Sequence, residues 1–158
     1  ASEHFKVRKV TGDGRCMFRA LVKGMALNKG LALGPREERD EADNLRMAVK
    51  EVLCNGEEER RQHELALLAI TLDESLRRYC QRIGRPNFWG GEPELLVLSK
   101  LYSQPITVYI PAHEHSRGGW GSGFIPIQEY GTEFCGNKKA RKVVRLLYSG
   151  KNHYDLLV

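Results

Sequence analysis

Apolar side chains recur at helical spacing over five stretches of the chain. The first stretch begins at Cys16, directly after a glycine-containing turn, and the second opens at Pro35, a residue favoured in the first turn of a helix. Thr71 or Asp73 is the expected N-cap of the fourth helix. The predicted helices are residues 16–28, 35–53, 57–70, 72–83 and 92–102.

The second half of the chain changes to β-branched and aromatic runs, which favour strands. A short alternating run near the start predicts one further strand. The predicted strands are residues 5–10, 106–110, 124–130, 143–148 and 153–158. Since most helices precede most strands, we predict an α+β fold with a small, mainly antiparallel central sheet flanked by helices. The glycine-rich residues 112–123 are expected to form a loop.

Composition fits one domain over residues 1–158, because 41% of the residues are apolar, 28% are charged, and no repeat or linker interrupts the chain. We find no apolar run of membrane-spanning length and no signal-peptide pattern at the start. The expectation is a cytoplasmic or nuclear monomer. Cys54 and Cys80 each end a helical apolar pattern, and with no Cys-x-x-Cys pair all four cysteines are expected to be reduced.

The net charge of +5 raises the alternative of a nucleic-acid-binding domain. Most basic residues alternate with acids, as solvated helix faces do, and the one net basic block is residues 138–142. We therefore keep nucleic-acid binding only as a remote alternative. His113 and His115 could form half of a metal site, but no third ligand neighbours them in the sequence, so we expect no metal.

Cys16 is the strongest candidate for chemistry. A thiolate is favoured at a helix N-terminus, and the preceding turn can direct the backbone N–H groups of Gly14, Arg15 and Cys16 toward an oxyanion. His153 begins a predicted strand, where Asp155 shares its face and can accept a hydrogen bond from the imidazole. These residues indicate a Cys-His hydrolase.

Three sequence blocks give this hydrolase a family. Gly12-Asp13-Gly14-Arg15-Cys16-Met17-Phe18-Arg19-Ala20-Leu21 resembles the nucleophile motif of the OTU (ovarian tumour) cysteine proteases, close to their plant members. Two further blocks follow in the family's order. They are Trp89-Gly90-Gly91-Glu92 with Glu94-Leu95 and Ile106–Tyr109, and then Asn152-His153-Tyr154-Asp155.

The resemblance implies an OTU fold and a thiol-dependent deubiquitinase that needs no cofactor. It implies Cys16 as nucleophile, His153 as general base and then acid, and Asp155 as the residue that orients the imidazole, with Asn152 as a second candidate for that role. Asp13 is implied as an active-site residue, and we expect its carboxylate to brace the loop before Cys16.

The implied partners are ubiquitin and polyubiquitin chains. Because ubiquitin ends in Gly-Gly, a narrow groove is expected, with walls formed by Trp89, Gly90, Gly91 and Tyr154. Glu92 or Glu94 could contact the basic face of ubiquitin. The main alternative is a catalytically silent module of the same family that binds ubiquitin without cutting it.

Overall fold

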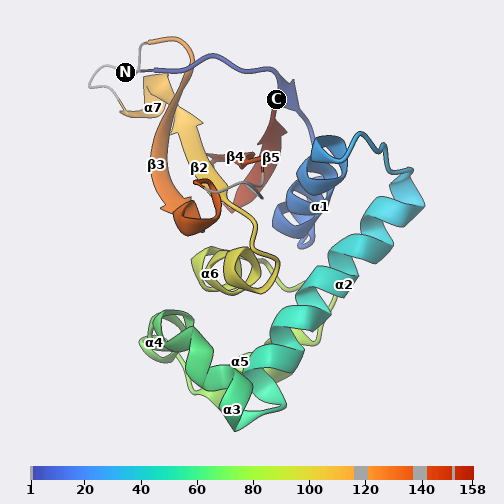
Figure 1. Cartoon of the computed structure of the whole chain (residues 1–158), viewed down its shortest axis with the longest axis vertical. Coiled ribbons are helices and arrows are strands. Elements are labelled where there is room, and N and C mark those ends of the chain that lie inside the picture. The colour runs from blue at the N-terminus through green and yellow to red at the C-terminus, as the bar shows by residue number, and fades with distance from the viewer. Residues whose placement is uncertain (1, 116–120, 137–141, 151) are drawn as a thin grey trace.

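The computed structural model describes residues 2–115, 121–136, 142–150 and 152–158. Helices and strands occupy two ends of the molecule, with the sheet at one end and a group of helices at the other (Figure 1). The helices are α1 (Cys16–Asn28), α2 (Pro35–Cys54), α3 (Glu57–Arg60), η1 (Arg61–His63), α4 (Glu64–Thr71), α5 (Leu76–Ile83), α6 (Glu92–Leu101), α7 (Ala112–His115) and η2 (Thr132–Phe134). The strands are β1 (Val7–Arg8), β2 (Ile106–Pro111), β3 (Phe124–Tyr130), β4 (Val144–Ser149) and β5 (His153–Leu157).

The five strands form one sheet in the order β1-β5-β4-β2-β3. Three of the four pairings are antiparallel and the β2–β4 pairing is parallel. The predicted α+β class with a mainly antiparallel sheet is thus confirmed. Strand β5, late in the chain, lies between β4 and the early strand β1. This order brings the segment after β1, which leads to Cys16, close to the strand that begins at His153.

Helix α1 packs on the sheet and supplies much of the core. Met17 and Phe18 in its first turn are fully buried, and Gly24 lets the helix approach β4 and β5 closely. A Cβ atom added at Gly24 would lie 2.6 Å from Val144 and 2.9 Å from Leu156. Helix α2 runs from beside α1 to the helices α3, α4 and α5 at the far end (Figure 1). Helix α1, which begins at Cys16, therefore sits between the sheet and α2.

Two predicted helices differ from the structure. The stretch predicted as residues 57–70 is divided into α3, η1 and α4, because His63 is buried with a non-helical backbone (φ −125°, ψ 45°). Helix α5 begins at Leu76, not at residue 72, and its N-cap is Ser75, whose hydroxyl accepts from Arg78 N at 3.2 Å. Neither Thr71 nor Asp73 caps this helix.

The cysteine prediction was wrong for one pair. Cys54 at the end of α2 and Cys80 in α5 form a disulfide, with Cα atoms 5.9 Å apart. Cys16 and Cys135 keep their thiols. The prediction failed because the pairing depends on how α2 and α5 pack together, and no local spacing of the two cysteines records that contact.

One predicted loop and the basic block lie partly outside the described residues. The glycine-rich stretch 112–123 opens with the short helix α7 instead of a loop, and residues 116–120 are not described. Of the basic block 138–142, only Lys142 is described. In the part of the chain that the structure covers, no helix combines the length and the apolar character needed to cross a membrane.

Candidate active site

Cys16 is the first residue of α1 and its side chain is almost completely buried, with 1% of its surface exposed. The short loop after β1 leads into it, and the Cys16 N–H donates to the Asp13 carbonyl at 3.1 Å. The Cys16 thiol donates to the backbone oxygen of Asn152 at 3.5 Å. The thiol therefore lies against the residue that immediately precedes His153.

His153 and Asp155 lie on one face of β5, as strand alternation predicted. His153 Nε2 lies 2.9 Å from Asp155 Oδ1, and the same oxygen accepts from Val10 N at 2.8 Å. Asp155 is buried, and its bond to Val10 fixes the carboxylate from the neighbouring strand segment. The side chain that contacts the imidazole is thus Asp155. Asn152, the second candidate, instead offers its backbone oxygen to the thiol from a left-handed turn conformation (φ 66°).

The other imidazole nitrogen of His153 faces the loop that carries Cys16. A Cβ atom built on Gly12 would lie 3.7 Å from His153 Nδ1. Because Nε2 is engaged by Asp155, Nδ1 is the ring nitrogen left to exchange a proton with a group on this side. The ring is therefore held at one nitrogen and open to chemistry at the other.

Asp13 braces the loop through its carboxylate. Its Oδ1 accepts from Arg15 N at 3.0 Å, and its Oδ2 accepts from Arg19 Nη2 at 3.2 Å. Two of the three predicted oxyanion donors, the N–H groups of Arg15 and Cys16, have acceptors within the loop. Of the three, Gly14 N–H is the one for which the described residues supply no acceptor.

Burial raises the pKa of the Cys16 thiol, and the nearby Asp13 and Asp155 carboxylates raise it further. The backbone N–H groups of Tyr154 and Met17 act in the opposite direction and lower this pKa. Burial has the largest effect, so the pKa lies above its ordinary value. The helix N-terminus alone does not produce the thiolate that the sequence suggested, and a proton acceptor is required.

A recess of about 250 Å³ is lined by residues of α4, α5 and α6, by the segment Phe88–Gly91, and by Asn152, whose backbone oxygen contacts the Cys16 thiol. Trp89, Gly90 and Gly91 line it together with Asn152, so three of the four predicted groove residues meet there. Tyr154 does not, because its side chain is buried and packs on Tyr148 with ring centroids 5.0 Å apart.

Two glycines allow residues 87–90 to pack closely against the loop before Cys16 and the first turn of α1. A Cβ on Gly90 would be 2.7 Å from Met17 Cε, and a Cβ on Gly14 would be 2.8 Å from the backbone of Asn87. Both distances are shorter than ordinary contacts of a Cβ atom. A side chain at either position would therefore require the neighbouring groups to shift.

The sequence reasoning missed the role of Glu94. Its buried carboxylate accepts from Gly91 N at 2.7 Å and from the Tyr79 hydroxyl at 2.5 Å, and so holds the glycine segment to α5 and α6. Glu94 therefore does not face solvent as an acid available to a partner. A usable signal was present, because Glu three residues after an N-cap position is typical of a capping box.

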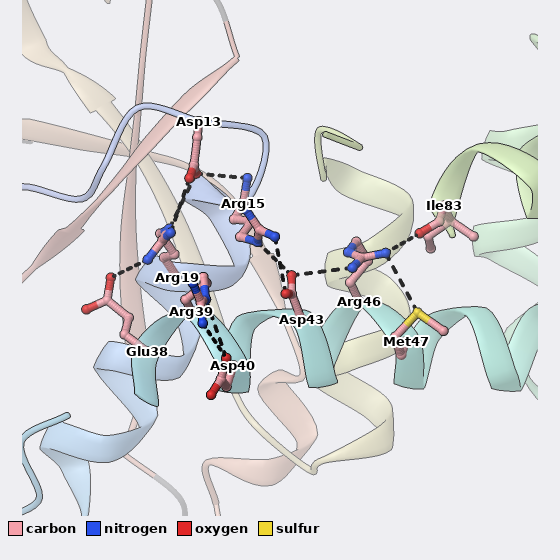
Figure 2. A network of polar contacts seen from close by, with 10 residues as sticks. All are labelled: Asp13, Arg15, Arg19, Glu38, Arg39, Asp40, Asp43, Arg46, Met47 and Ile83. Carbon is pink, nitrogen blue, oxygen red and sulfur yellow. Dashed lines mark hydrogen bonds and ion pairs between the residues drawn. The ribbon is translucent and has the colours of Figure 1, made fainter. Parts of the chain in front are cut away.

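A second feature missed from the sequence is a set of ion pairs that joins residues 13–19, around Cys16, to α2 (Figure 2). Arg15 and Arg19 contact Asp43 and Glu38, respectively, which lie one or two turns into α2. These contacts involve residues far apart in the chain, and no local pattern announces them.

Comparison with known proteins gives the chain a family. A family model described as OTU-like cysteine protease matches residues 11–154. An Arabidopsis thaliana protein, OVARIAN TUMOR DOMAIN-containing deubiquitinating enzyme 3, is 68% identical over 160 residues, covering 98% of this chain and 68% of that protein. The Arabidopsis OVARIAN TUMOR DOMAIN-containing deubiquitinating enzyme 4 is 36% identical over 155 residues, covering 98% of this chain and 43% of that protein.

The fold has solved counterparts as well. The Hazara virus OTU bound to ubiquitin superposes with a TM-score of 0.63 at 23% identity, over 100% of this chain and 86% of that one. This likeness concerns the fold alone. The family match over residues 11–154 and the relative at 68% identity carry the assignment: the chain belongs to the OTU-like cysteine proteases.

Proposed function

We propose that residues 1–158 form a catalytic domain that hydrolyses isopeptide bonds between ubiquitin and lysine side chains. The observation that carries the proposal is the position of the Cys16 thiol, 3.5 Å from the backbone of the residue before His153, whose ring is held by Asp155. Two further findings support it. The relative at 68% identity is named a deubiquitinating enzyme, and a similar fold has been solved with ubiquitin bound.

In the proposed reaction, His153 Nδ1 removes the thiol proton of Cys16 as substrate enters. This step is needed because burial raises the pKa of the thiol. The thiolate attacks the carbonyl carbon of the C-terminal glycine of ubiquitin. His153 then gives its proton to the lysine nitrogen, the C–N bond breaks, and a thioester to Cys16 remains.

Water completes the cycle. His153 accepts a proton from a water molecule as its oxygen attacks the thioester, and ubiquitin leaves with a free carboxylate while Cys16 regains its proton. Throughout, Asp155 holds the imidazole and stabilises its charged form. Gly14 N–H is the donor best suited to the oxyanion, with Arg15 and Cys16 N–H contributing where their bonds to Asp13 are shared.

The recess, which reaches the site at Asn152, suits the ubiquitin tail. A chain that ends in Gly-Gly carries no side chains at its last two positions, and the Gly90–Gly91 segment likewise presents backbone instead of side chains. Trp89, which is 44% exposed, can cover such a tail at the mouth of the recess. We therefore assign substrate contact to Trp89, Gly90 and Gly91.

A ubiquitin derivative with a C-terminal electrophile tests the proposal. We expect it to form a covalent adduct with the wild-type chain at Cys16, and the Cys16→Ser variant to form none. Cleavage of diubiquitin should disappear in the same variant. Cys135→Ser is the matched control, because Cys135 is an exposed free cysteine at the end of η2, and this variant should label as the wild type does.

The alternative of a silent ubiquitin-binding module gives a different result. A folded wild-type chain that binds ubiquitin but neither labels at Cys16 nor cleaves diubiquitin would overturn the enzymatic proposal. Binding of nucleic acid that weakens steeply with salt and survives Cys16→Ser would instead point to the remote alternative.

A further inference from the structure

The side chain of Arg15, the residue directly before Cys16, points onto α2 (Figure 2). Arg15 Nε donates to Asp43 Oδ1 at 2.7 Å, and Nη2 donates to Oδ2 at 3.3 Å. This two-point contact restricts the orientation of the guanidinium in a way that a single contact cannot. The residue that positions Cys16 is thus fixed from outside its own loop.

Asp43 is itself held in place by Arg46. Arg46 Nη2 lies 3.4 Å from Asp43 Oδ1, and Nη1 donates to the Ile83 carbonyl at the end of α5 at 2.8 Å. The Arg46 side chain is only 5% exposed, and its Nε has no hydrogen-bond partner among the described residues. A buried nitrogen without a partner is costly, which indicates that the two outer nitrogens determine how this side chain is oriented.

The charge state of Asp43 fits this arrangement. Burial raises the pKa of Asp43, but the hydrogen bonds and charges of Arg15 and Arg46 outweigh it and hold the pKa below its ordinary value. The carboxylate therefore stays ionised across the neutral range and keeps both arginines bound.

A second set of contacts ties the same loop to α2 one turn earlier. Arg19 donates to both carboxylate oxygens of Asp13, and its Nη1 lies 3.6 Å from Glu38 Oε1. The loop is thus joined to α2 at two points. Arg19 links Asp13 to Glu38, and Arg15 contacts Asp43 directly. Two anchor points prevent the loop from rotating about either one.

An ordinary surface ion pair contributes little, and α2 offers one for comparison. Arg39 and Asp40 lie 3.3 Å apart with side chains 47% and 59% exposed, whereas those of Arg15 and Asp43 are 22% and 30% exposed. The exposed pair also connects neighbours within one helix. The Arg15–Asp43 pair, by contrast, joins α2 to the loop before Cys16.

We propose that Asp43, supported by Arg46, is a positioning residue that fixes the backbone of residues 14–16 through Arg15 and so aligns the oxyanion donors with Cys16. The inference rests on the proposed function, because it assigns a role in the same reaction. Asp43 touches no reacting atom. Its effect is on geometry at the tetrahedral intermediate.

This role separates two reactions of the same thiol. Attack on a carbonyl creates an oxyanion that the loop must stabilise, whereas alkylation by iodoacetamide displaces iodide from a carbon and creates no oxyanion. A variant that disturbs only the loop should therefore slow acylation and leave alkylation unchanged. A variant that disturbs the fold should slow both.

The test uses Asp43→Asn, which removes the charge and keeps the shape. Three rates are measured in a Cys135→Ser background: hydrolysis of a fluorogenic ubiquitin C-terminal amide, acetylation of Cys16 by p-nitrophenyl acetate with release of nitrophenolate, and alkylation by iodoacetamide. We expect kcat on the ubiquitin amide to fall about tenfold with KM within about twofold, and the acetylation-to-alkylation ratio to fall similarly.

Asp40→Asn, on the same helix and in the exposed pair, is the matched control and should stay within about twofold of wild type in all three rates. Arg15→Lys keeps the charge but loses the two-point contact, so it should also lower the acetylation-to-alkylation ratio. If Asp43→Asn does not unfold cooperatively, Arg15→Lys decides whether the positioning role holds. Adding Arg15→Lys to Asp43→Asn should cause no further loss, because both changes break one contact.

An unchanged acetylation-to-alkylation ratio in Asp43→Asn and Arg15→Lys would overturn the positioning role, whether both rates stay the same or both fall equally. The proposed function fails separately. If the wild type does not hydrolyse the ubiquitin amide at all, the deubiquitinase assignment is wrong, while the ratio with the two small reagents still decides the role of Asp43.

Discussion

At the scale of single residues, Glu94 combines deep burial with two hydrogen bonds that fix the recess. Burial raises its pKa to about 7, while the bonds from Tyr79 and Gly91 lower it in part. A glutamate carboxyl in an unfolded chain has a pKa of ~4.3. The folded chain therefore holds a proton on Glu94 over a pH range in which the unfolded chain has released it.

This difference predicts how stability depends on pH. The contribution of Glu94 is fully present below about pH 4.3 and is lost as the pH rises toward about 7, a change on the order of 3 kcal/mol. In urea unfolding at a series of pH values, the wild type should lose stability relative to Glu94→Gln over this range. Glu92→Gln, in the same turn but exposed, should run parallel to the wild type. Parallel curves for Glu94→Gln and the wild type would contradict the prediction.

Asp155 and Asn152 make contrasting predictions about His153. Asp155→Asn should lower kcat by about 10²- to 10⁴-fold, because the carboxylate that orients and stabilises the imidazole is lost. Asn152→Gly keeps the backbone oxygen and the left-handed conformation, so its loss should be much smaller. Steady-state hydrolysis of the ubiquitin amide measures both. A larger loss in Asn152→Gly than in Asp155→Asn would reverse the assignment.

At the scale of secondary-structure elements, the disulfide joins two helices that also carry the site's supports. Helix α2 carries Asp43, and α5 carries Tyr79 and ends at the Ile83 carbonyl that binds Arg46. The bond thus fixes the relative position of the elements that brace the loop and the recess.

Removing this bond should lower the free energy of unfolding. A link between residues 26 positions apart corresponds to a stabilisation of about 3 to 4 kcal/mol in the chain-entropy model. We expect the urea midpoint to fall by the matching amount in Cys54→Ser/Cys80→Ser and in the wild type under reducing conditions. Cys135→Ser should leave the midpoint unchanged. An identical midpoint with and without reductant would show that the bond does not contribute.

The elements also show where sequence reasoning succeeds. Periodicity and composition predicted α1, α2, β2 and β3 closely. They could not divide residues 57–70, because the composition there stays helical and only the buried His63 interrupts the backbone. They also could not reveal that β2 and β4 run parallel, since a strand pattern does not record its neighbour.

At the scale of the whole molecule, the same division holds for the site. Cys16, His153 and Asp155 could be predicted because each sits at the start of an element or shares a strand face, and local spacing places it. Arg15–Asp43, Tyr79–Glu94 and Cys54–Cys80 depend on contacts between helices. The residues proposed to react are therefore visible in the sequence, and the residues that hold them in place are not.

The strand order has a consequence for the timing of synthesis. A ribosome adds Cys16 137 residues before His153, and at roughly 5 to 20 residues per second this interval lasts roughly 7 to 27 seconds. Until β5 enters between β1 and β4, the emerging polypeptide lacks both the imidazole proposed as the base and the carbonyl that contacts the thiol. On the proposed mechanism, hydrolysis of ubiquitin linkages thus begins only when β5 is inserted into the sheet.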